Sequence, residues 1–301
     1  MRPHVEAIQQ SDLVWHQAEL HKVNTAARQR NLSYDEENGA ASTRVLFDKA
    51  WSQPTGYYHA DVEWYVLHGQ VRLGERFLGK GSYFRAPAGL RIPQLEVAAG
   101  TDVLVFREYG DWGFSPSAKN RSKTIVRGGN TVSTEIGELT IADSNRMEWM
   151  PNAYEGDTQR FLKLKVLYLD PPSPDDHNTG FVTILAWSPP GWSDNRMVHH
   201  PVFEEAYCVD GHMDYNFGRL SAGAYFFRPA RVKHGHFVAG EEKGMTGLFR
   251  LDGNLINWIT VNERVVMEGT PVNYDPRTEG PVLAGIPVRS KSIGKWDLNG
   301  Q

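Results

Sequence analysis

Apolar and polar residues alternate in short runs along most of the chain. This is the pattern of β-strands that bury one face. Glycines and prolines separate the runs, as they do at tight turns. The runs cover residues 41–47, 57–67, 70–73, 81–85, 101–109, 161–169, 179–187, 244–251 and 255–261. The pattern therefore predicts an all-β protein built from many short strands.

The second half of the chain repeats the first at an offset of 142 positions (205 − 63). The spacing from Gly69 to Gly81 equals that from Gly211 to Gly223, twelve residues in each. The residues that recur are Glu63, Tyr65, Gly69, Leu78, Gly81, Tyr83, Phe84, Pro87 and Ala88, matched by Glu205, Tyr207, Gly211, Leu220, Gly223, Tyr225, Phe226, Pro229 and Ala230. A shared period with shared glycines predicts one strand–turn–strand unit used twice.

The repeat predicts two domains, residues 1–135 with a connecting segment at their end and residues 136–301. Residues 110–135 are polar and rich in glycine and serine, as a connection between domains would be. Residues 12–28 fit either one helix capped by Asp12 or a strand over 13–15. The strand is favoured because a similar segment at 147–149 holds the matching place in the second half. The tail over 281–301 is expected to pack across the surface.

Of the two copies of the repeat, only the second has a group of side chains that can bind a metal ion. His199 and His200 precede Glu204, and His234 follows the next predicted strand. Imidazoles with a carboxylate suit divalent transition metals. The first copy has Tyr57, Tyr58, Val62 and Ile92 at these four positions. The scaffold is thus duplicated, and a metal site is predicted in the C-terminal copy with a degenerate one in the N-terminal copy.

These motifs resemble those of the cupin superfamily, and the duplication resembles a bicupin. Glu204 and Gly211 stand seven residues apart, as in the first cupin motif. Gly223, Pro229 and His234 fit the second motif, with Arg231 in place of its inner glycine. The run over 223–235 is similar to an uncharacterised cupin family related to the cupin half of the anti-sigma factor ChrR, and to small metal-dependent dioxygenases. The resemblance implies two tandem cupin barrels, which are double-stranded β-helices or jelly rolls.

The resemblance also implies a metal held by His200, Glu204 and His234. The cupin motif contains His-x-His, and here one of those histidines is missing or displaced, so a ligand role for His199 stays open. Fe(II) is the expected ion, with Mn, Ni, Co or Zn as other choices. His236 and Glu205 are the candidate catalytic residues, although either can serve the fold instead. The aromatic residues expected to line a substrate pocket are Trp187, Trp192, Tyr207 and Phe227.

The function expected from this site is that of a dioxygenase acting on a small enolisable or phenolic carbonyl compound, with O2 as a second substrate. Two alternatives stay open: a redox-neutral isomerase or lyase, and a non-catalytic cupin that senses or binds a small molecule. No strand is followed by a glycine-rich phosphate loop, which disfavours nucleotide-dependent classes.

Composition limits the setting in which this chemistry would occur. The formal net charge of −4, without a basic stripe, gives no electrostatic basis for binding nucleic acid. No apolar run approaches the ~20 residues of a membrane span, and residues 1–6 lack the apolar core of a signal peptide. The single cysteine, Cys208, excludes an internal disulfide. We therefore expect a cytoplasmic protein, and a homodimer by analogy with bicupins.

Overall fold

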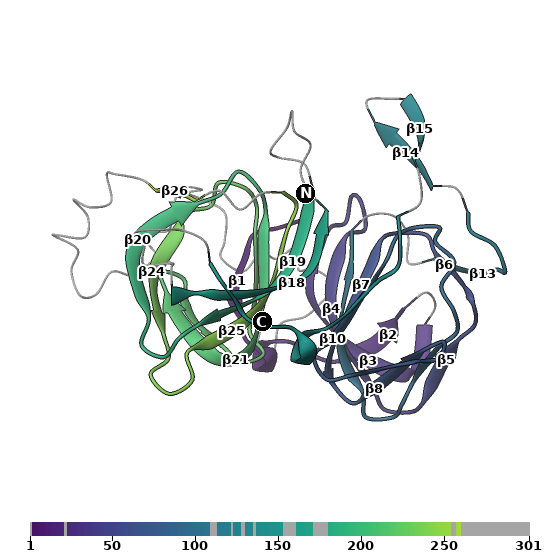
Figure 1. Cartoon of the computed structure of the whole chain (residues 1–301), viewed down its shortest axis with the longest axis horizontal. Coiled ribbons are helices and arrows are strands. Elements are labelled where there is room, and N and C mark those ends of the chain that lie inside the picture. The colour runs from purple at the N-terminus through teal and green to yellow at the C-terminus, as the bar shows by residue number, and fades with distance from the viewer. Residues whose placement is uncertain are drawn as a thin grey trace. The chain divides into compact units, whose positions relative to one another are not determined.

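The computed structural model describes residues 2–20, 23–108, 113–121, 123–127, 130–134, 137–152, 161–170, 180–253 and 257–259. Across these residues the only helices are two 3-10 turns, η1 (Gln10–Asp12) and η2 (Ser144–Arg146). Everything else that is regular is antiparallel β-sheet (Figure 1). The chain divides into two compact units, one of residues 1–2 with 14–147 and one of residues 3–13 with 148–301.

Unit 1 is built on a seven-stranded sheet with the order β16-β10-β7-β12-β4-β3-β2. Its strands are β2 (His16–Glu19), β3 (Val23–Tyr34), β4 (Ala41–Phe47), β7 (Val62–His68), β10 (Ser82–Ala86), β12 (Asp102–Arg107) and β16 (Thr140–Asp143). A four-stranded sheet has the order β5-β11-β8-β9, from β5 (Trp51–Gln53), β8 (Gln70–Leu73), β9 (Arg76–Gly79) and β11 (Leu95–Val97). Two hairpin-like pairs complete the unit: β6 (Gly56–Tyr58) with β13 (Phe114–Pro116), and β14 (Lys123–Arg127) with β15 (Asn130–Thr134).

The core of unit 1 fills the place where the second copy has its predicted metal ligands. Trp64 stacks between Phe47 and Phe84, with ring centroids 6.1 and 5.6 Å away. Tyr58, Val62 and Ile92, the counterparts of His200, Glu204 and His234, belong to the same buried cluster. The cavity beside them measures only about 10 Å³, about the room that one water needs. This interior is therefore packed as an apolar core.

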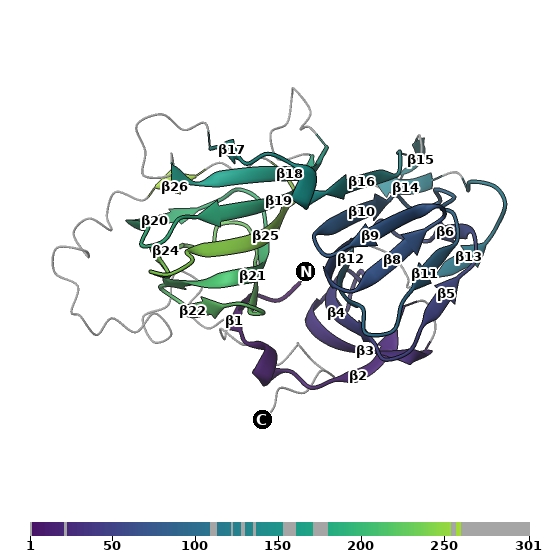
Figure 2. The ribbon, with the colours of Figure 1, turned by 60° about the horizontal axis from the view of Figure 1, so that its bottom comes forward.

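Unit 2 contains an eleven-stranded sheet whose main path runs β17-β18-β19-β25-β21-β24-β20-β26 (Figure 2). Off this path, β1 pairs with β23, and β22 and β23 each pair with β21. The strands are β1 (Val5–Ile8), β17 (Met150–Pro151), β18 (Lys163–Asp170), β19 (Phe181–Ser188), β20 (Ser193–His199), β21 (Glu204–Tyr215), β22 (Gly218–Ser221), β23 (Tyr225–Arg228), β24 (His234–Ala239), β25 (Met245–Leu251) and β26 (Trp258–Ile259).

The sequence repeat is visible in the strand register. Tyr65 lies opposite Tyr83 in unit 1, and Tyr207 lies opposite Tyr225 in unit 2. The hydroxyl of Tyr83 donates to Glu63 at 2.8 Å, and that of Tyr225 donates to Glu205 at 2.5 Å. The predicted all-β fold of two tandem cupin barrels is confirmed.

Three local expectations meet a different structure. Neither the helix over 12–28 nor the strand over 13–15 forms; β2 and β3 occupy this region and extend the sheet of unit 1. Residues 3–13 belong to unit 2 rather than to the first barrel, because β1 pairs with β23. The structure divides the units after Met147 rather than after residue 135. The predicted tail over 281–301 and most of the predicted last strand lie outside the described residues.

Candidate metal centre

Three of the four predicted metal ligands come together inside unit 2. His200 follows the end of β20, Glu204 begins β21 and His234 begins β24. Their possible ligand atoms all lie within 4.8 Å of one another, and all three side chains are buried. The two Nε2 atoms are 3.2 Å apart, and Glu204 Oε2 lies 3.3 Å from His234 Nε2 and 3.8 Å from His200 Nε2. One small volume is thus faced by two ring nitrogens and one carboxylate oxygen.

The loop before β24 holds the imidazole of His234 in a form that can bind a metal. His234 Nδ1 lies 3.0 Å from the carbonyl oxygen of Val232. A carbonyl only accepts, so Nδ1 carries the hydrogen and the lone pair of Nε2 faces the site. Burial lowers the pKa of His234 well below its usual value, and the charge of Arg228 adds to this effect. The ring is therefore neutral, as a metal ligand must be.

The backbone of this loop also holds His200. The amide of Arg231 donates to the carbonyl oxygen of His200 at 2.8 Å. Arg231 has a φ of 71°, in the left-handed region that favours glycine. It stands where the cupin motif has its inner glycine, so this chain keeps the turn without the usual residue.

A buried ionic chain that sequence reasoning missed supports Glu204 from behind. Arg228 Nη1 donates to Glu204 Oε2 at 2.7 Å, while Arg228 Nε donates to Glu6 Oε1 at 2.6 Å. Glu6 also accepts from the hydroxyl of Tyr215 at 2.6 Å and lies 2.9 Å from His4 Nε2. Glu6 belongs to β1, 222 residues before Arg228. No local pattern in the sequence could have linked two residues so far apart.

Within this group of buried ionic side chains, Arg228 and the carboxylates stabilise one another's charged forms. Burial lowers the pKa of Arg228, but the carboxylates of Glu6 and Glu204 outweigh it and raise that pKa above the usual value. Burial raises the pKa of Glu6, but Arg228 and His4 together outweigh burial, so the pKa of Glu6 is lowered. One buried guanidinium is thus shared by two carboxylates, one of which faces the two imidazoles.

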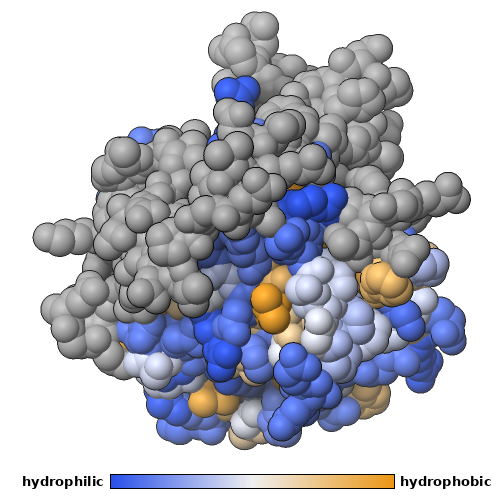
Figure 3. All heavy atoms as spheres, turned by 90° about the vertical axis from the view of Figure 1, so that its left-hand side faces the viewer, coloured by the Kyte–Doolittle hydropathy of each residue, from blue (hydrophilic) through white to orange (hydrophobic). Residues whose placement is uncertain are grey.

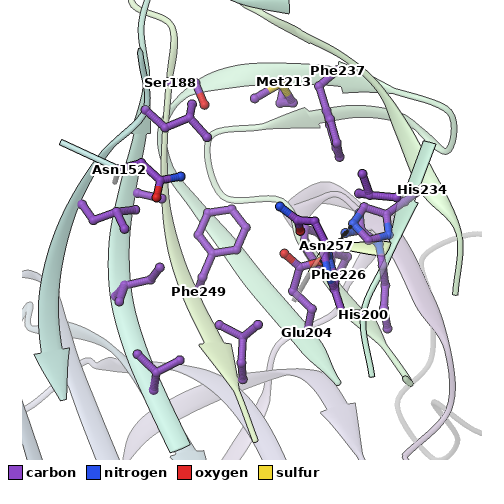
Figure 4. Close-up of a pocket in the computed structure, with 18 of the residues that line it drawn as sticks. Asn152, Ser188, His200, Glu204, Met213, Phe226, His234, Phe237, Phe249 and Asn257 are labelled. Atoms are coloured by element: carbon purple, nitrogen blue, oxygen red, sulfur yellow. Dashed lines mark hydrogen bonds and ion pairs between the residues drawn. The ribbon is translucent and has the colours of Figure 1, made fainter. Parts of the chain in front are cut away.

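The three residues form one side of a cavity of about 360 Å³ (Figure 4). Figure 4 shows His200, Glu204 and His234 close together. Phe249 projects into the space between this group and Asn152 on the other side of the cavity. Most of the lining is apolar and comes from β18, β19, β21, β23 and β25. A cavity of this volume lies within the ~300–1,000 Å³ range of small-molecule sites.

Strand alternation separates the predicted pocket residues. Trp192 lines the cavity, whereas Trp187, Tyr207 and Phe227 do not. Successive side chains of a strand point to opposite faces. Ala186 and Ser188 face the cavity, so Trp187 faces away; Phe226 and Arg228 face it, so Phe227 faces away. The expectation that all four aromatic residues line the pocket was wrong for three of them.

The same alternation places Glu205 and His199 elsewhere. Glu205 accepts hydrogen bonds from Tyr225 and Arg250 on the opposite face of β21 from Glu204. Arg228, by contrast, contacts Glu204 and Glu6. His199 lies between Val198 and His200, which both line the cavity, and does not itself line it.

His236 does not follow the alternation. In a regular strand it would share a face with His234, but its φ of 55° turns the chain, and the pairing of β20 with β24 shifts register there. As a result, Phe237 faces the cavity in its place, with its ring centroid 5.7 Å from that of His234. A sequence cannot reveal such a bulge when the residue at it is a histidine rather than a glycine.

The donor set fits a divalent transition metal. Two imidazoles and one carboxylate form the set typical of non-haem Fe(II) sites with open coordination positions. Among the residues that the structure describes, Glu204 is the only carboxylate in the group, which suits Ca²⁺ or Mg²⁺ poorly because these ions prefer several oxygen ligands. His200, Glu204 and His234 would hold the ion.

Comparisons with known proteins agree with the fold. A family described as "Domain of unknown function (DUF4437)" matches residues 6–258. A "putative dioxygenase" from Nostoc punctiforme is 19% identical, with a TM-score of 0.61 over 85% of this chain and 80% of that one. No curated protein matches the sequence.

Two further structures share the fold at low identity. A variant of oxalate decarboxylase from Bacillus subtilis is 13% identical, with a TM-score of 0.52 over 95% of this chain and 87% of that one. Protein Ylba from E. coli, of family DUF861, is 14% identical, with a TM-score of 0.53 over 82% and 93%. These likenesses place the chain among cupin-fold proteins. Across the described residues, no helix has the length and apolar character to cross a bilayer.

Proposed function

This chain belongs to the family described as "Domain of unknown function (DUF4437)", whose description names no activity, and we therefore propose its function from the site. We propose a metal-dependent dioxygenase that acts, in unit 2, on a small enolisable or phenolic carbonyl compound. The observation that carries this proposal is the buried group of His200, Glu204 and His234 on the wall of a mainly apolar cavity. Fe(II) is the proposed ion, and the "putative dioxygenase" from Nostoc punctiforme has a similar fold.

Each part of the site has a defined task in this proposal. When bound, the ion supplies Lewis acidity and one-electron chemistry with O2. His200 and His234 present Nε2 atoms, and Glu204 presents a carboxylate that Arg228 holds in place. Phe226, Phe237 and Phe249 exclude water from the volume that the substrate would occupy.

The alternatives have less support from the geometry. A redox-neutral isomerase or lyase needs a group that moves protons, and His236 and Glu205, the candidates for that role, do not line the cavity. A sensing role, suggested by the similarity to the ChrR family, fits the same pocket without turnover. The dioxygenase proposal therefore rests on showing that the loaded protein consumes O2.

The first experiment compares two adjacent glutamates. The Glu204→Gln protein is expected to lose at least about 100-fold in Fe(II) or Co(II) affinity, because a carboxylate ligand is removed. The matched control, Glu205→Gln, changes the next residue on the opposite face and is expected to keep its metal whenever it folds. Affinity is measured by titration calorimetry, with metal content after dialysis as a check. A Glu204→Gln protein that binds metal as wild type does would refute the proposed centre.

The second experiment tests turnover. Fe(II)-loaded protein is supplied with a panel of diketones and phenolic ketones, and O2 uptake is followed with an electrode. We expect substrate-dependent uptake of one O2 per substrate consumed, absent in Glu204→Gln. Conversion of a panel member without O2 uptake would instead identify the redox-neutral alternative, and bound iron without any turnover would favour the sensing role.

A further inference from the structure

We propose that this site takes a mainly apolar molecule with one chelating pair of oxygens, and that it rejects small dicarboxylates. This inference rests on the proposed metal centre and deepens it by naming the substrate class. It separates this chain from oxalate decarboxylase, which has a similar fold. Two features of the cavity favour such a molecule: the charges of its lining residues and the apolar character of its walls.

Charge in the cavity disfavours a doubly negative ligand. The charged side chains that line it, across the described residues, are Asp170, Glu204 and Arg228. Arg228 is bonded to Glu204 at 2.7 Å and to Glu6 at 2.6 and 3.2 Å, so its charge is already met by two carboxylates. A dicarboxylate would depend on the metal alone and would bring two negative charges near Glu204. Like charges in a low-dielectric site repel strongly.

The walls favour an apolar body. Opposite the histidines, β18 and β19 present aliphatic side chains to the cavity, including Leu164, Val166, Val182 and Ala186. These four are only half buried, although they face inward. Their exposed apolar surface is what a ligand would cover, with a gain of roughly 25 cal/mol per Å². A small dianion would leave this surface in contact with water.

The remaining polar groups suit a neutral ligand. Asn152 and Ser188 line the cavity away from the three metal-binding residues, and Asn257 lies beside those residues (Figure 4). An amide and a hydroxyl can each donate to or accept from a neutral oxygen. They supply no charge to hold a second carboxylate. The substrate therefore presents its chelating end to the metal and its apolar part towards β18 and β19.

The test measures binding to the Zn(II)-loaded protein, so that turnover plays no part. The probes are oxalate, pentane-2,4-dione and 1-phenylbutane-1,3-dione; the two diones share a chelating end and differ in apolar area. Affinities from calorimetry are compared with those of each probe for free Zn(II) in the same buffer. We expect the phenyl dione to bind at least about tenfold more tightly than pentane-2,4-dione. We expect oxalate to bind the protein more weakly, relative to free Zn(II), than either dione.

Two variants carry the same new side chain on opposite faces of β19. Ala186→Leu fills part of the cavity and is expected to lower the affinity for the phenyl dione about tenfold, with Zn(II) and pentane-2,4-dione unaffected. Trp187→Leu, the adjacent residue, does not line the cavity and is expected to leave all three affinities unchanged. The wild-type comparison stands whether or not either variant folds.

The possible outcomes distinguish a wrong substrate class from a wrong metal centre. Equal affinity for the two diones, no binding of either, or a preference for oxalate beyond that of free Zn(II) would each overturn the substrate class while leaving the metal centre intact. Failure of wild-type protein to bind Zn(II), Co(II) or Fe(II) would instead overturn the centre itself.

Discussion

At the scale of single residues, the side to which a strand directs each side chain decides its role. Glu204 and Glu205 are neighbours, yet one faces the imidazoles and the other accepts hydrogen bonds from Tyr225 and Arg250. In unit 1, Glu63 corresponds to Glu205 and likewise accepts a hydrogen bond from a tyrosine, Tyr83. The counterpart of Glu204 there is the buried Val62. One position of the duplicated strand therefore serves the fold in both units, and the position before it is free to differ.

The only cysteine of the chain gives a prediction at this scale. Cys208 is fully buried, and burial, with the charge of Asp210 adding to it, raises its thiol pKa to about 12. A higher thiol pKa means less reactive thiolate at any pH below it. We expect labelling by a disulfide reagent at pH 8 to be at least about 1,000-fold slower in native protein than in urea. Fast native labelling would show that this part of β21 opens readily.

Residue-level patterns predicted part of the site and missed the rest for definable reasons. Spacing grouped His200, Glu204 and His234 correctly, although a bend over 201–202 separates His200 from β21 and the three residues come from three different parts of the sheet. It failed at His236, where a bulge with φ of 55° breaks the alternation. Trp187, Tyr207 and Phe227 were predicted from their aromatic character, although they stand at strand positions whose side chains point away from the cavity. Glu6 carries no local signal, since its role depends on a contact 222 residues away.

At the scale of elements, the strand that matters most for the site is the short β1. It pairs with β23, with Val5 opposite Phe227, and so places Glu6 against Arg228. The repeat predicted the strands of both barrels well, since their periods and turn glycines are local features. It could not predict that residues 3–13 join unit 2, because that pairing depends on tertiary contacts and not on any propensity of the segment.

The Glu6→Gln variant tests the contribution of β1. Removing one charge from a fully buried ion pair is expected to cost about 3–5 kcal/mol of unfolding free energy at pH 7. Because the pKa of Glu6 is lowered on folding, its contribution is complete above about pH 4.5 and declines as pH falls through the folded pKa. The difference between wild type and variant, measured by urea unfolding, should therefore shrink from pH 7 to pH 3. A difference that does not depend on pH would contradict this assignment.

At the scale of the whole molecule, duplication has produced two barrels with different interiors. The cavity in unit 1 measures about 10 Å³, whereas the cavity in unit 2 measures about 360 Å³. At the positions that match the three predicted ligands, unit 1 has residues of its hydrophobic core. Buried His and Glu side chains need partners, whereas Tyr58, Val62 and Ile92 need only close packing. The first barrel is thus expected to contribute stability rather than chemistry.

Metal stoichiometry tests this division. We expect about one divalent ion per chain by native mass spectrometry of Co(II)-loaded protein. Tyr58→Phe in unit 1 should leave that number unchanged, whereas His200→Phe at the matching position of unit 2 should abolish binding. Two ions per chain, or loss of the ion in Tyr58→Phe, would show that unit 1 holds a metal after all.

The pairing of β1 with β23 also sets the order of events on the ribosome. Glu6 leaves the ribosome 222 residues ahead of Arg228, a delay of roughly 10–45 s at ordinary rates of translation. During that interval β1 cannot pair with β23, so its backbone groups are available to pair with the strand edges of other chains. A nascent chain that stalls before Arg228 lacks both the partner of Glu6 and the proposed ligand His234, so it could not yet hold the metal.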